Sequence, residues 1–69
     1  MWEIIDDEGV VYSGTQEEMR KAFDAMTLDY TELMGIYNLN SSQAEFLKHE
    51  WTTDWEGDIK LIQIHEINR

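Results

Sequence analysis

Three carboxylates stand at alternate positions near the C-terminal end of the sequence: Asp54, Glu56 and Asp58. Oxygen ligands at this spacing can surround a calcium ion in a loop. An EF-hand loop, however, needs glycine at its sixth position and glutamate at its twelfth, and counting from Asp54 places Ile59 and His65 there. We therefore interpret the segment as a solvated acidic turn and expect no metal site.

The two histidines, His49 and His65, are the other residues suited to acid–base chemistry. A glutamate follows each of them, but adjacent side chains on a helix or strand point in different directions and do not form a ready pair. The sequence has no cysteine, and it contains no H-E-x-x-H, P-loop or G-x-S-x-G motif. We expect surface histidines, no cofactor and a protein that is not an enzyme.

Trp55 stands inside the acidic turn, where a large aromatic side chain could anchor a binding partner. A second acidic run precedes Gly9. If a C-terminal strand pairs antiparallel with the first strand, both acidic segments lie at one end of the sheet. Solvated turns without a binding role are the alternative. The predicted partner-binding residues are Asp6, Asp7, Glu8, Asp54, Trp55, Glu56 and Asp58.

The whole chain is strongly acidic, with 15 Asp and Glu against 5 Lys and Arg and a formal net charge of −10. This charge repels nucleic acid and anionic membranes, and no apolar run is long enough to cross a bilayer. It also disfavours the sequestration of anionic ligands, which needs clustered basic residues. Carboxylates spread over a small domain can imitate a nucleic-acid backbone and occupy a basic groove, although solubility alone also explains them.

The acidic run before Gly9 is expected to be the turn of a β-hairpin. β-branched and aromatic residues flank it at residues 2–5 and 10–13, and glycine can adopt the positive φ of a hairpin turn. Thr15 and Glu18 then form a capping box that starts a helix. The apolar stripe of this helix is Met19, Ala22, Phe23 and Met26.

The rest of the chain predicts further helices and a last strand. Within residues 28–38, the cap residue Asp29 precedes apolar residues at helical spacing: Tyr30, Leu33, Met34 and Tyr37. Ile36 and Tyr37 would also suit a strand, so the segment is either a helix or a strand. Ser42 and Glu45 form a capping box for a third helix. Residues 59–67 predict a terminal strand with apolar residues on both faces, so we expect either a bulge or a cover on each face.

These elements predict a single α+β domain over residues 1–69. An N-terminal β-hairpin, two to three helices and a C-terminal strand would complete a three-stranded antiparallel sheet of order 2-1-3. That order leaves two edge strands, which a twofold homodimer commonly covers. The expected core residues are Ile4, Val11, Phe23, Met26, Leu47, Trp51, Leu61 and Ile64.

The two ends of the chain carry a family resemblance. They read Trp2-Glu-Ile-Ile-Asp-Asp-Glu-Gly-Val-Val-Tyr-Ser-Gly-Thr-Gln-Glu-Glu-Met and Trp55-Glu-Gly-Asp-Ile-Lys-Leu-Ile-Gln-Ile. They resemble short proteins of phages and prophages of Gram-positive bacteria, which pair an I-x-D-x-x-G … G-T-x-E-E start with a terminal W-x-G-D-L-x-L-x-x-I strand. The resemblance covers about half of the chain and implies a cytoplasmic accessory protein of a bacterial host.

The sequence thus predicts a non-enzymatic phage-type accessory protein. It would inhibit or modulate a host or defence protein that has a basic surface, with nucleic-acid mimicry as one mode of binding. We expect no direct contact with nucleic acid or membrane. The alternative is a small homodimeric structural or ligand-sequestering protein without a nucleic-acid enzyme as its target.

Overall fold

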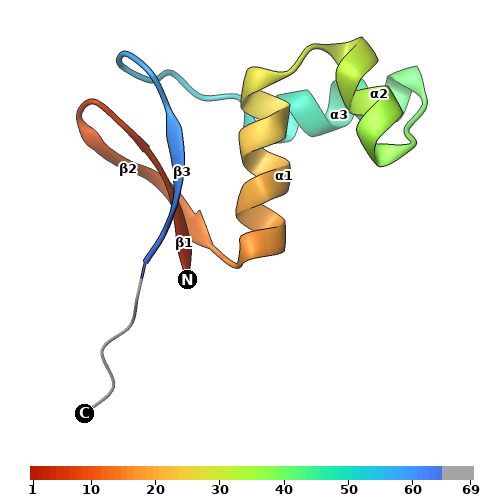
Figure 1. Cartoon of the computed structure of the whole chain (residues 1–69). Helices are drawn as coiled ribbons and strands as arrows, with labels where there is room; N and C mark the ends of the chain where they lie inside the picture. Colours follow the sequence, from red (N-terminus) through yellow and green to blue (C-terminus); the bar gives the residue numbers. More distant parts are fainter. Residues whose placement is uncertain (65–69) are drawn as a thin grey trace. The chain divides into compact units, whose positions relative to one another are not determined.

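The computed structural model describes residues 1–64 of the chain. Its elements are β1 (Trp2–Asp6), β2 (Gly9–Gly14), α1 (Gln16–Thr27), α2 (Tyr30–Tyr37), α3 (Ser41–Trp51) and β3 (Lys60–Gln63) (Figure 1). They form two compact units, one of residues 1–23 with the chain from Asp54 onward, the other of residues 24–53. α1 runs without a break from the first unit into the second.

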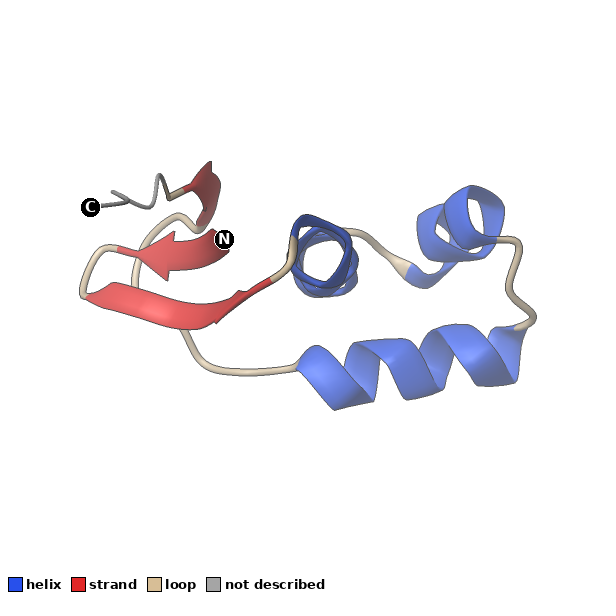
Figure 2. Cartoon of the chain, turned by 90° about the horizontal axis from the view of Figure 1, so that it is seen from below, coloured by secondary structure: helices blue, strands red, loops and turns tan. Residues whose placement is uncertain are grey.

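The first unit holds a three-stranded antiparallel sheet of order β2-β1-β3, which confirms the predicted α+β fold and strand order. β1 lies in the middle, with β2 and β3 at the edges (Figure 2). β3 is shorter than the predicted strand 59–67, and the end of that range lies outside the described residues.

Of the two alternatives for the terminal strand, a bulge or a cover on each face, the structure shows no bulge in β3; an irregularity lies in the hairpin. Ile4 pairs with Tyr12 and Ile5 pairs with Val10, so Val11 is an extra residue on β2. β3 pairs regularly with β1 throughout. An extra residue in one strand increases the local twist and bends that strand. The apolar residues on both faces of β3 therefore reflect a regular strand with two partly covered faces.

Alternation along β1 gives the sheet one buried face. Ile4 is fully buried, and its neighbours across the sheet, Tyr12 and Leu61, are half-buried. On the opposite face, Ile5 is half-buried and Val10 is exposed. One face of the sheet therefore contributes the core of this unit, as period-two side-chain alternation requires.

α1 begins as its capping signal predicts. The Thr15 hydroxyl accepts a hydrogen bond from the Glu18 N–H at 3.2 Å, and the Thr15 carbonyl accepts one from Met19. Met19 and Ala22 are buried in the first unit. They lie three residues apart on one face of the helix, which is the spacing that the apolar stripe predicts.

The second unit contains the end of α1 and a pair of packed helices, α2 and α3. Residues 30–37 are helical, which settles the choice between helix and strand for most of the segment 28–38. The Asp29 carboxylate accepts a hydrogen bond from the Glu32 N–H at 2.8 Å and caps the start of α2. Asn38, in the left-handed conformation with φ 54°, ends it.

The predicted cap of α3 is wrong by two residues. The helix starts at Ser41, and its capping box joins Asn40 to Gln43 rather than Ser42 to Glu45. Both pairs have the right spacing and residue types. Because α2 ends at Tyr37 with a left-handed Asn38, the chain reaches extended backbone at Asn40, where a cap residue must lie.

The core prediction is confirmed in part. Three of the expected residues are buried, and the other five are half-buried because a chain this short has little interior. The buried ones are Ile4, Met26 and Leu47; the half-buried ones are Val11, Phe23, Trp51, Leu61 and Ile64. Five more buried residues were not among those eight, although two of them, Met19 and Ala22, belong to the predicted apolar stripe of α1: Met19, Ala22, Ala25, Leu33 and Ala44.

Candidate acidic binding surface

The two acidic segments lie together in the first unit, at one end of the sheet, as predicted (Figure 1). The Asp7 N–H donates a hydrogen bond to the Glu56 carbonyl at 3.0 Å, and the Glu56 N–H donates one to the Asp6 carboxylate at 3.0 Å. The second of these bonds joins residues fifty positions apart in the sequence. The turn between β1 and β2 and the loop before β3 therefore form one tied structure.

The Asp6 carboxylate accepts hydrogen bonds within the chain, and its part in partner binding stays a prediction. One oxygen accepts hydrogen bonds from the Glu8 N–H at 2.8 Å and the Gly9 N–H at 3.0 Å, while the other accepts from Glu56. The Glu56 N–H, followed by the Glu8 N–H, lowers the pKa of this carboxyl from its ordinary value of 3.8. Asp6 therefore holds the two loops together.

Gly57 allows the two loops to approach closely. Its φ is +72°, in the left-handed region that side chains rarely adopt. A Cβ atom at this position would meet only the Asp7 carboxylate, the far end of an exposed side chain that can turn aside. Position 57 therefore requires glycine for its backbone conformation.

The remaining predicted residues face solvent. Their carboxylates are exposed, and the Trp55 side chain, 37% exposed, lies in the same loop. We call this set the acidic loop surface. It consists of Asp7, Glu8, Asp54, Trp55, Glu56 and Asp58. The arrangement presents several negative charges and one aromatic side chain on loops that are tied together.

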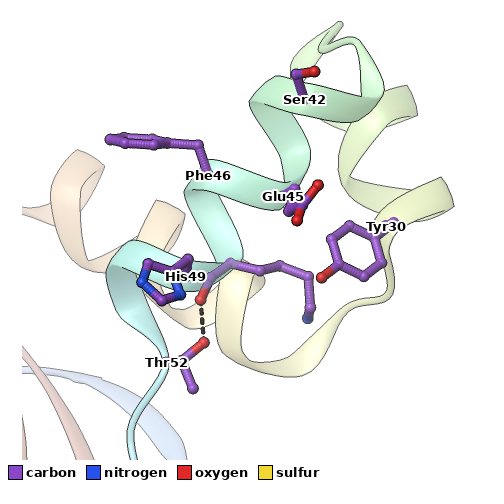
Figure 3. A pocket seen from close by; sticks show the side chains of 7 residues that line it. Tyr30, Ser42, Glu45, Phe46, His49 and Thr52 are labelled. Carbon is purple, nitrogen blue, oxygen red and sulfur yellow. Dashed lines mark hydrogen bonds between the residues drawn. The ribbon is translucent and has the colours of Figure 1, made fainter.

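The second unit has a separate hollow of about 560 Å³ on α3, which sequence reasoning missed. Phe46, 68% exposed, and Tyr30, 48% exposed, are its aromatic residues, and the Phe46 ring points away from Tyr30 (Figure 3). His49 is exposed, as predicted. The residues that line the hollow are Tyr30, Ser42, Glu45, Phe46, Lys48, His49 and Thr52. The only available signal was the recurrence of Ser42, Glu45 and His49 on one helical face.

Ser42, Glu45 and His49 are separate lining groups. Within residues 1–64, no hydrogen bond joins the His49 imidazole to either of the other two side chains. The Thr52 hydroxyl donates to the Lys48 carbonyl and so belongs to the end of α3. The hollow offers contact surface without a hydrogen-bonded relay.

Two further searches of the described part of the chain gave negative results. No helix there is long and apolar enough to cross a membrane. No group of three or more His, Asp or Glu side chains in residues 1–64 could hold a metal ion.

The chain matches no protein-family model, no curated protein and no solved structure. The fold and the surface therefore define it only as a small α+β protein with a tied pair of acidic loops.

Proposed function

We propose that this protein is a non-enzymatic binding protein that docks its acidic loop surface onto a basic surface of a partner protein. The observation that carries the proposal is the pair of hydrogen bonds between the two loops, through Asp7, Glu56 and Asp6. They gather carboxylates from two distant segments at one end of the sheet. A surface assembled in advance loses less conformational entropy on binding than a flexible loop does.

Charge and aromatic content support the same proposal. Exposed carboxylates on a chain of net charge −10 accelerate encounter with a basic partner over about 8 Å, the Debye length in physiological salt. Trp55 supplies an aromatic side chain that a partner can desolvate, and tryptophan is enriched among residues that dominate binding energy. Charge would govern the association rate, and Trp55 would govern the dissociation rate.

The finer form of the proposal concerns the partner. The carboxylates would occupy a groove that normally holds nucleic-acid phosphates, and the partner would be a host or defence protein that is inhibited as a result. The resemblance of both chain ends to short phage and prophage proteins supports this form. The cytoplasm of a bacterial host is the corresponding location.

A capture experiment from bacterial lysate tests the proposal. Wild type is compared with Asp54→Asn/Asp58→Asn and with the matched control Glu45→Gln/Glu50→Gln, which removes the same charge from α3. We expect the loop variant to lose capture, the control to retain it, and high salt to weaken it. Elution by double-stranded DNA would support mimicry, whereas equal capture by both variants would contradict the proposal.

Trp55→Ala isolates the contribution of the aromatic side chain once a partner has been captured. The dissociation rate is expected to rise roughly tenfold or more, as for a truncated aromatic anchor, while the association rate changes little. An unchanged dissociation rate would remove Trp55 from the interface. Loss of binding in the α3 control variant would move the site to the hollow.

The alternative function is that of a structural homodimer. The open edges of β2 and β3 favour it, because unpaired strand edges can pair with a second copy. Repulsion between two chains of net charge −10 opposes it. Sedimentation at micromolar concentration separates the two: a stable dimer would favour the alternative, and the 8.2 kDa monomer alone would count against it.

A further inference from the structure

The outer edge of β3 pairs with no other strand within residues 1–64, and the hydrogen bonds between β1 and β3 identify the backbone groups that face it. The Ile64 N–H donates to the Met1 carbonyl at 2.8 Å, in register with the pairs that join β1 to β3. In an antiparallel ladder, residues of one strand alternately face the partner strand and point away from it. The backbone N–H and carbonyl groups of Ile62 and Lys60 therefore point toward β1, like those of Ile64.

The backbone groups of Leu61 and Gln63 consequently point away from β1, toward the open edge. Each has an N–H and a carbonyl that an added strand could use. Gln63 is exposed, and Leu61 is half-buried. Four ladder hydrogen bonds are therefore available along two residues of the regular β3 strand.

The other edge of the sheet is less suited to strand addition. β2 carries the extra residue Val11, and bulges at edges twist a strand away from incoming partners. β3 has no irregularity in its pairing with β1. The charge of the exposed Lys60 would repel a basic residue directly opposite it on an added strand. The other positions along this edge carry no such charge.

Charge selects the kind of segment that would bind there. Asp58 lies two residues before Lys60, about 7 Å along an extended chain, and belongs to the acidic loop surface. A strand added antiparallel to β3 would have its C-terminal end beside Asp58. Basic residues at that end would lie within a Debye length of the loop carboxylates.

We propose that β3 accepts an extended segment of the partner as a fourth strand, antiparallel to β3. Apolar or β-branched residues of that segment would lie opposite Leu61 and Gln63. Lys or Arg at its C-terminal end would lie beside Asp58. The proposal rests on the proposed function, because the same acidic loops attract the partner. It adds the main-chain contact that fixes the partner's direction. Strand addition of this kind draws affinity from backbone hydrogen bonds and specificity from alternate side chains.

Two synthetic peptides of identical composition provide the probe: Val-Thr-Val-Thr-Val-Lys-Lys and its reversed form, Lys-Lys-Val-Thr-Val-Thr-Val. Amide hydrogen exchange of the full chain is followed by NMR. Without peptide, we expect the Leu61 and Gln63 amides to exchange faster than those of Ile62 and Ile64. The first peptide should slow exchange at Leu61 and Gln63 and bind roughly tenfold more tightly than the reversed one, the size of two exposed charge pairs.

A matched pair of proline substitutions tests the edge itself. Gln63→Pro removes an outward N–H without removing a bond to β1, and proline is tolerated at sheet edges. Ser13→Pro does the same on β2, because Ser13 pairs with Glu3, whose backbone groups face β3. We expect only Gln63→Pro to abolish binding of the first peptide.

The outcomes separate this proposal from the proposed function. Three results would overturn strand addition at β3. One is protection from amide exchange on β2 instead of β3, and another is equal binding of the two peptides. The third is unchanged exchange at both Leu61 and Gln63. If Gln63→Pro disrupts the fold, the exchange pattern of the wild-type chain still decides. Lysate capture that depends on Asp54 and Asp58 but not on Gln63 would sustain the proposed function alone.

Discussion

Replacing Lys48 with methionine should destabilise the second unit, because Lys48 stabilises the end of α1 from another helix. Its ammonium donates hydrogen bonds to the Ala25 carbonyl at 3.0 Å and the Leu28 carbonyl at 2.6 Å. α1 has no basic residue in its own last turn. The ammonium also lies 5.6 Å from the centre of the Tyr30 ring.

The magnitude follows from these contacts. Hydrogen bonds from a charged group contribute about 1.5 to 3 kcal/mol, a helix C-terminus adds about 0.3 to 1 kcal/mol, and an exposed cation–π contact adds about 0.5 to 1 kcal/mol. Half-exposure of Lys48 and the entropy of holding its side chain reduce the sum. We expect Lys48→Met, which keeps the aliphatic stem, to lose about 2 kcal/mol.

The assay is thermal unfolding followed by circular dichroism. For a domain of this size, about 2 kcal/mol corresponds to a fall in Tm of roughly 10 °C. Arg20→Met is the matched control, because it removes the same charge from an exposed position on α1. Equal melting temperatures for the two variants would refute the assigned role of Lys48.

Further predictions concern the loops and the core. Gly57→Ala should lose about 1 to 2 kcal/mol of stability from left-handed strain, as chemical denaturation would show. Adding Asp7→Ala should recover little of this loss, because the exposed Asp7 carboxylate can turn aside. Hydrogen bonding lowers the pKa of Asp6, so the stability that its ionised carboxylate contributes is present above pH 3.8. This stability is lost as the pH falls through the lowered pKa. The difference in denaturation midpoint between wild type and Asp6→Asn should therefore shrink as the pH falls below 3.8. Phe23→Ala should lose about 2 kcal/mol in the same measurement, less than for a fully buried phenylalanine, and an unchanged midpoint would exclude Phe23 from the core.

Unfolding of the whole chain tests the expectation of a single domain. α1 belongs to both compact units, so loss of either unit removes part of the support for this helix. Far-ultraviolet circular dichroism and tryptophan fluorescence should therefore report the same transition. Separate transitions would show that the units unfold independently.

Local sequence patterns determined most of the secondary structure. β-branched runs around a glycine-containing turn specify the hairpin, and Asp29 and Thr15 provide short-range hydrogen bonds that start helices. Such signals act within a few residues and can be recognised without knowledge of the fold. Strand order also followed, because alternating chain direction and short connections leave few arrangements.

The candidate site was predictable at the level of its two segments but not at the level of each residue's role. Antiparallel pairing of the first and last strands was enough to place both acidic segments at one end of the sheet. Asp6 already accepts hydrogen bonds from the N–H groups of Glu8 and Gly9 within its own turn, which local spacing allows. Its further bond from the Glu56 N–H, which ties the two loops together, depends on the fold.

Tertiary structure decided the features that depend on distant contacts. Lys48 stabilises carbonyls that lie more than one helix earlier in the chain, and Asp6 accepts a bond from a residue fifty positions away. Where two capping boxes of equal local quality overlap, the end of the preceding helix selected Asn40. Hydrogen bonds between distant segments fix the roles of Lys48 and Asp6, and sequence spacing does not record which segments meet.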